Sequence, residues 1–90
     1  METALKFILL TPAQQVAETD ASYVSVAGES GDFGVLPGHM AMVSTLRPGG
    51  IVAVTGPGGI ITSYTVSSGV AEVSPQGVTI LAESATAIPA

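Results

Sequence analysis

Short runs of apolar residues alternate with turn-forming residues along the whole chain. The first run, Leu5–Leu10, is apolar on both faces apart from Lys6, which predicts a strand buried on two sides. In a later run Val24 and Val26 share one face of a predicted strand. No stretch keeps a helical period, so the pattern predicts strands at Leu5–Leu10, Gln14–Thr19, Ser22–Ala27, Met40–Leu46, Ile51–Thr55, Ile60–Ser67, Val70–Val73 and Val78–Leu81.

Segments rich in glycine and proline separate these runs. Gly28–Gly34 is predicted to be a loop, Gly56–Gly59 a hairpin turn and Ser74–Gly77 a tight turn. About eight to ten short strands with closely spaced turns are typical of an all-β sandwich or barrel. We expect one domain over residues 1–84 and a short C-terminal tail over residues 85–90. The small, apolar end of the chain, Ser84–Ala90, should fray.

Composition narrows the possible partners of the protein. The 90 residues fit a single domain, with 47% hydrophobic and only 10% charged residues and a net charge of -5. The only basic side chains, Lys6 and Arg47, cannot neutralise a run of phosphates, which disfavours nucleic-acid binding. No cysteine is present, so disulfides and cysteine-ligated metals are excluded. The low charge predicts that part of the surface is covered by another molecule.

The longest uncharged segment, residues 48–71, is long enough to span a bilayer as a helix. Pro57 and several glycines within it would each weaken such a helix. The apolar run at Phe7–Leu10 is too short for a secretory signal. We therefore expect no membrane insertion and an intracellular, soluble domain.

His39 is the only histidine in the sequence, and histidine is the residue type best suited to act as a base near neutral pH, so it is a candidate catalytic base. Catalysis would need Asp32 or Glu29 as a partner and a nucleophile from the set Ser44, Ser63 and Ser68. None of these serines lies in a nucleophile-elbow sequence, which favours a turn or interface histidine. Glu29 and Asp32 lack the other oxygen ligands of a calcium loop, which disfavours a calcium site. From these candidates together, we expect no metal, no cofactor and no catalytic residue.

The segment Gly31–His39, with the sequence GDFGVLPGH, carries three glycines and one proline. Such residues occur where a backbone path must be fixed and closely approached. We expect Phe33 and Leu36 to point inward and Asp32 to lie at the tip. On these grounds alone, an ordinary hairpin and a partner-binding loop are equally well supported.

Four stretches of this sequence resemble one family. GDFGVLPGH is followed by STLRPG at residues 44–49, by VSSGVAEV at residues 66–73 and by VTILAE at residues 78–83. In this order they resemble the N-terminal domain of the F-type ATP synthase epsilon subunit, which is called delta in mitochondria. The resemblance covers Leu5 to about Ala85.

The resemblance implies a flattened β-sandwich of about ten antiparallel strands. It also implies a non-catalytic subunit of the central stalk, which couples the gamma subunit to the c ring of a proton- or sodium-translocating synthase. The complex would lie at the cytoplasmic face of the bacterial inner membrane, or on the matrix side in mitochondria. The implied c-ring contact falls on Glu29, Ser30, Gly31 and Asp32, and the implied gamma contact on Thr11, His39 and Ser44.

The sequence departs from the family in one respect. Members usually continue into a C-terminal helical hairpin, whereas this sequence ends at Ala90. Hairpin-mediated inhibition and ATP sensing are therefore not expected of these 90 residues. The alternative from another class is a free-standing β-sandwich that binds a small ligand, or a hydrolase that uses His39.

Overall fold

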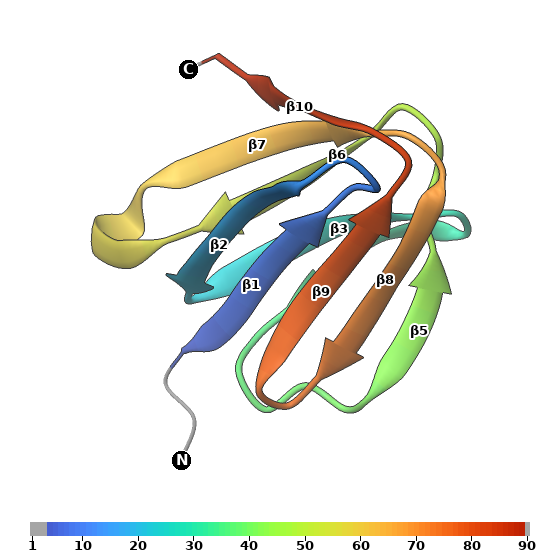
Figure 1. Ribbon diagram of the computed structural model, residues 1–90. Coiled ribbons are helices and arrows are strands. Elements are labelled where there is room, and N and C mark those ends of the chain that lie inside the picture. Colours follow the sequence, from blue (N-terminus) through green and yellow to red (C-terminus); the bar gives the residue numbers. More distant parts are fainter. Residues whose placement is uncertain (1–3, 90) are drawn as a thin grey trace.

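The computed structural model describes residues 4–89, in which ten strands form two facing five-stranded sheets (Figure 1). Sheet A has the order β2 (Gln15–Ala21), β1 (Leu5–Leu10), β9 (Gly77–Ala82), β8 (Gly69–Ser74), β5 (Met42–Thr45). Sheet B has the order β10 (Ala85–Ile88), β7 (Ile61–Val66), β6 (Gly50–Thr55), β3 (Tyr23–Gly28), β4 (Gly31–Val35). The principal extents of 33 × 27 × 22 Å describe a flattened sandwich, so the predicted fold class is confirmed.

Neighbouring strands pair antiparallel in both sheets, with one exception. β1 pairs with β9 in parallel, from Lys6 opposite Gly77 to Leu10 opposite Leu81. A parallel pair needs a long connection, and here most of the chain lies between the two strands. The sandwich implied by the resemblance was one of antiparallel strands, and this one pair departs from it. The sequence pattern does not show which distant strands meet.

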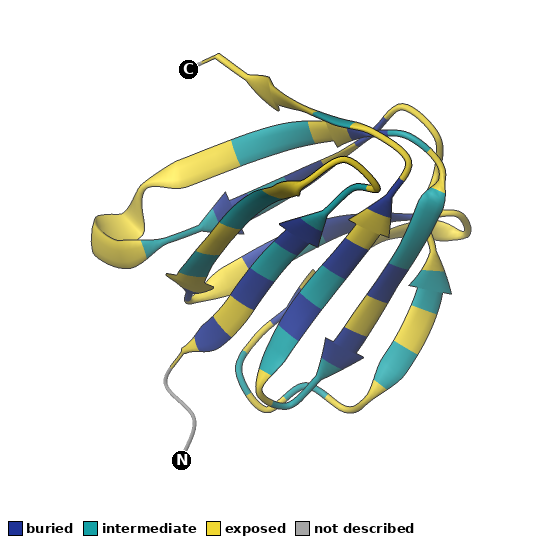
Figure 2. Ribbon diagram, viewed as in Figure 1, coloured by how far each residue is buried: buried dark blue, intermediate teal, exposed yellow. Residues whose placement is uncertain are grey.

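The core lies between the two sheets and is built by alternating side chains. Along β1, Leu5, Phe7 and Leu9 are buried, whereas Ile8 and Leu10 are only half-buried on the outside of sheet A. Figure 2 shows this alternation as stripes along β1, β9 and β8. The prediction that β1 is buried on two sides is therefore wrong, because no second layer formed by residues 4–89 covers the outside of sheet A.

One predicted loop is a strand. β3 ends at Gly28, and β4 pairs back onto it after a turn of two residues, Glu29 and Ser30. Gly34, which made this segment look irregular, lies under the ring of Tyr23, where a Cβ atom would overlap the ring. The glycine therefore serves close packing within a strand.

The end of the chain is also more ordered than its composition predicted. Ala85–Ile88 forms β10, which pairs antiparallel with β7, and Ala85 packs against the core. The expected fraying is thus wrong for these four residues, because the edge of β7 offers unpaired backbone groups. The division of the chain into residues 1–84 and 85–90 stays a prediction.

The predicted turn at Gly56–Gly59 is confirmed. Pro57–Gly59 forms the single-turn 3₁₀ helix η1 between β6 and β7, with positive φ angles at Gly58 and Gly59. Among residues 4–89 this is the one helical element. None of the described helices is long and apolar enough to cross a membrane.

Candidate functional site

The β3–β4 turn presents a short polar tip. Gly28 lies opposite Gly31, so Glu29 and Ser30 form the tip, and both are exposed. Gly31 has a φ of 141°, a conformation that side chains other than glycine rarely adopt. Asp32 lies inside β4, and the prediction that it forms the tip of the loop is wrong.

Arg47 holds this turn from the side. Its Nη1 donates a hydrogen bond of 3.1 Å to the carbonyl oxygen of Gly28. Its Nη2 lies 2.8 Å from Asp32 Oδ1, as both a hydrogen bond and an ion pair. The backbone N–H of Glu29 also donates to the carbonyl oxygen of Thr45 at 2.8 Å. The turn is therefore fixed on both of its strands, and we call this arrangement the Arg47 clamp.

Sequence reasoning missed the role of Arg47, and only one signal hinted at it. Arg47 is one of two basic residues in the chain, so an acidic partner was to be expected. Which of the seven acidic residues it meets depends on the fold.

Two large side chains of the segment Gly31–His39, Phe33 and Leu36, were expected to point inward. Phe33 does pack against the core, whereas Leu36 is 60% exposed, so that expectation is confirmed only for Phe33.

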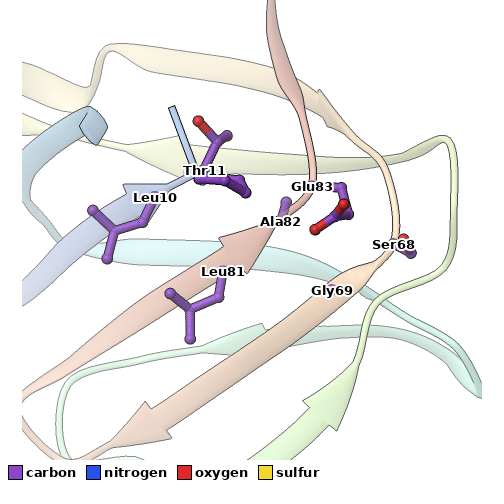
Figure 3. Close-up of a pocket in the computed structure, with 8 residues that line it drawn as sticks. Leu10, Thr11, Ser68, Gly69, Leu81, Ala82 and Glu83 are labelled. Atoms are coloured by element: carbon purple, nitrogen blue, oxygen red, sulfur yellow. The ribbon is translucent and has the colours of Figure 1, made fainter. Parts of the chain in front are cut away.

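The outer face of sheet A carries a row of apolar side chains. Leu10, Leu81 and Val70 stand opposite one another on β1, β9 and β8. At the end of the row lies a shallow groove of about 710 Å³, lined by Leu10, Thr11, Pro12, Ser68, Gly69, Leu81, Ala82 and Glu83. Figure 3 shows Leu10 and Leu81 projecting side by side, with Glu83 beyond them near Ser68. The row Leu10–Leu81–Val70 and this groove are referred to below as the sheet A face.

The structure does not gather the three residues of the expected gamma contact into one cluster. Thr11 follows β1 and lines the groove. His39 lies at the other end of sheet A, where the N–H of Gly38 donates to the carbonyl oxygen of Pro75. Ser44 belongs to the edge strand β5 and points inward, because a Cβ atom on Gly28 would lie 3.1 Å from its Oγ. The three residues thus border sheet A from different sides.

The geometry around His39 does not assemble a catalytic group. Its Nδ1 lies 2.8 Å from the carbonyl oxygen of Met40, and Asp32 is engaged by Arg47. Ser63 lies on β7 in the other sheet, and Ser68 lines the groove at the opposite end of sheet A. Within residues 4–89 no three acidic or histidine side chains form a metal-binding group.

A second hollow lies between the sheets at the open edge beside β2. It has a volume of about 480 Å³, and its wall includes Phe7 and Tyr64, whose ring centroids are 6.4 Å apart. Its one carboxylate belongs to Glu18, which already lies 3.8 Å from Lys6 Nζ. A ligand-binding site normally combines an apolar wall with several convergent polar groups, so this hollow gives little support to the ligand-binding alternative.

Comparison with known proteins decides the family. The family model of the "ATP synthase, Delta/Epsilon chain, beta-sandwich domain" matches residues 4–88. The chain belongs to this family. The resemblance seen in the sequence is thereby confirmed, and so is the sandwich that it implied.

Individual members of the delta/epsilon family show the same relation. The ATP synthase epsilon chain of Rhodopseudomonas palustris (strain BisB5) is 44% identical over 82 residues, which are 91% of this chain and 59% of that relative. The epsilon chain of Maricaulis maris (strain MCS10) is 41% identical over 88 residues, which are 98% of this chain and 65% of that relative. The present chain therefore spans less than two thirds of these relatives.

Solved structures agree with this assignment. A chain in the mitochondrial ATP synthase of Euglena gracilis, solved as its OSCP/F1/c-ring part, superposes with a TM-score of 0.89 at 26% identity. That alignment covers 97% of this chain and 55% of the other. A chain in the central stalk/c-ring structure of the Tetrahymena thermophila enzyme has a TM-score of 0.71 at 14% identity, covers 90% and 64% of the two chains, and shows the fold alone.

Proposed function

We propose that this domain is a central-stalk subunit of an F-type ATP synthase, which couples the gamma subunit to the c ring during ATP synthesis. It acts without catalysing a reaction itself, in a complex that translocates protons or sodium ions. The complex sits at the cytoplasmic face of the bacterial inner membrane or on the matrix side in mitochondria. Its epsilon-chain relatives and the Euglena structure, which includes a c ring, support this role.

The observation that carries the proposal is the clamped β3–β4 turn. Glu29 and Ser30 stand exposed on a turn that the guanidinium of Arg47 ties to Gly28 and Asp32. A rotor contact must transmit torque without slipping, which requires a stiff support. A close-packed core under a clamped turn provides that stiffness, since protein interiors have low compressibility. We propose that Glu29, Ser30, Gly31 and Asp32 form the c-ring contact, with Asp32 acting through the clamp.

The gamma subunit is proposed to cover the outside of sheet A. Thr11 lines the groove at one end of this sheet, and His39 and Ser44 lie at its other end and along its edge strand. Gamma would therefore contact Thr11 and His39 at the margins of its footprint, and would reach Ser44, whose side chain points inward, along the free edge of β5. The half-buried apolar side chains of β1 and β8 would then be covered, which accounts for the low charge of the chain.

A binding experiment tests the c-ring part of this proposal. Glu29→Lys places the wrong charge at the tip and leaves the clamp intact, so it should weaken co-purification with a gamma–c-ring subcomplex by about tenfold. Ile61→Lys/Thr86→Lys, on the exposed outside of sheet B, changes the net charge by the same two units, so it is the matched control and should bind normally. Equal binding of both variants, with unchanged circular dichroism, would remove the turn from the c-ring contact. Failure of the unaltered chain to co-elute with the subcomplex at micromolar concentration would overturn the coupling role itself.

A further inference from the structure

Both basic side chains of the protein are already engaged within the chain. Lys6 Nζ lies 3.4 Å from Asp20 and 3.8 Å from Glu18, and Arg47 binds Asp32. The sequence contains no other lysine or arginine. Among the described residues, no lysine or arginine is therefore left to pair with a further carboxylate, and a lysine or arginine partner would have to come from another molecule.

Two such carboxylates flank the apolar row of sheet A. Glu72, on β8, stands opposite Thr79, two residues along each strand from the pair Val70 and Leu81 and therefore on the same face. Glu83 lies just beyond β9 and lines the groove on the other side of the row. Both glutamates are exposed, and within residues 4–89 neither has a basic side chain within ion-pair distance. The sheet A face is thus an apolar strip with an unpaired acid on each side.

We propose that the sheet A face docks a basic amphipathic helix, whose apolar side covers Leu10, Leu81 and Val70 and whose lysines or arginines meet Glu72 and Glu83. The proposal rests on the proposed function in one respect, namely that the helix belongs to gamma. The chemistry itself comes from this chain alone.

The dimensions of the face suit a helix. The row spans three neighbouring strands, which is two strand spacings or about 10 Å, and a helix with its side chains is about as wide. Along β9, four residues separate the level of Glu72 from Glu83, which corresponds to about 13 Å. Basic residues eight apart on a helix are separated by about 12 Å and lie close to one face. β1, β9 and β8 each have a neighbouring strand on both sides, so they offer no free edge to which another strand could pair. Their outer face can instead be covered by a helix.

The strands of sheet B carry no unpaired carboxylate. β3, β6, β7 and β10 contain no charged residue, and Asp32 on β4 is taken by Arg47. A basic helix would find no counter-charge there. Sheet B therefore serves as the internal control for the proposal.

Two probes test this docking. The first is a synthetic helical peptide with leucines on one side and lysines eight residues apart on the margin, and the second is purified gamma. Each is titrated against the 90-residue chain at about 50 and about 300 mM salt. The variant Glu72→Gln/Glu83→Gln removes two negative charges from the sheet A face. Ile61→Lys/Thr86→Lys changes the net charge equally on sheet B, where both residues are exposed. Leu81→Asp tests the apolar strip.

We expect Glu72→Gln/Glu83→Gln to weaken both probes about tenfold at low salt and to lose most of the salt dependence. Leu81→Asp should weaken binding at both salt concentrations, and the sheet B variant should bind within about twofold of the unaltered chain. If the peptide binds the two double variants equally well, the proposal is overturned whatever gamma does. If the peptide follows the expected order and gamma binds none of the chains, the docking chemistry stands and the gamma assignment fails. A self-associating chain that Leu81→Asp renders monomeric in sedimentation would identify a second copy as the occupant and overturn the proposal.

Discussion

Replacing Arg47 by alanine is the most direct test of how the β3–β4 turn is held. The substitution removes the hydrogen bond to the Gly28 carbonyl oxygen and the ion pair with Asp32 at once. Asp32→Asn is the matched partner, because it removes the ion pair and leaves the bond to Gly28. The difference between the two variants therefore measures the hydrogen bond to Gly28 together with the Nη2–Oδ1 hydrogen bond, which an asparagine oxygen can still accept.

The structure sets the size of each effect. The side chains of Arg47 and Asp32 are 44% and 64% exposed, so their ion pair contributes only about 0.2–1 kcal/mol to the free energy of unfolding. The partly buried hydrogen bond to Gly28 contributes about 1–1.5 kcal/mol. Arg47→Ala should thus cost about 1–2.5 kcal/mol, and Asp32→Asn at most about 1 kcal/mol. For a domain of this size, the larger loss lowers Tm by about 5–15 °C.

Urea unfolding of the 90-residue chain measures these losses, and hydrogen exchange reports on the turn itself. The amide of Glu29, which donates to Thr45, should exchange faster in Arg47→Ala than in Asp32→Asn. Binding to the gamma–c-ring subcomplex should fall in the same order. Equal stability of the two variants, together with unchanged exchange at Glu29, would refute the clamp.

Two further predictions concern the sandwich. Gly69→Ala should cost about 1–3 kcal/mol, because the new Cβ atom would overlap the carbonyl oxygen of Leu81 on β9. Gly56→Ala is its control in the same urea titration and should be nearly neutral, since the nearest atoms would lie 3.7 Å from the new Cβ atom; equal losses would contradict the close approach. Ending the chain after Ser84 removes β10 and should cost about 1–3 kcal/mol, with faster amide exchange along β7. A chain ending at Ile88 serves as control, and equal exchange in the two chains would show that β10 does not stabilise the sheet.

Most strands were predictable because alternation is a local property. Val24 and Val26 were expected on one face, and both are fully buried. β4 and β10 were missed for a common reason. Their sequences, GDFGV and ATAI, are short and rich in small residues, and what makes them strands is a neighbour: Tyr23 over Gly34, and the open edge of β7.

The candidate sites divide in the same way. That residues 29–32 form an exposed, acidic, constrained segment could be seen from the glycines around them. The contact between Arg47 and Asp32 could not be predicted from the sequence. The two residues lie 15 positions apart and meet only through the register of the β3–β4 hairpin. For the same reason the pattern placed Asp32 at the tip, where the fold places Glu29 and Ser30.

The sequence by itself determined the class of the fold, the family and the side of most strands that faces the core. It could do so because side chains alternate along a strand with a period of two, and because turns depend on local residue types. The tertiary structure alone decided that β1 runs parallel to β9, and that Leu10, Leu81 and Val70 stand in one row between Glu72 and Glu83. Such rows depend on the register between strands far apart in the chain, and a shift by one residue would turn each side chain to the opposite face.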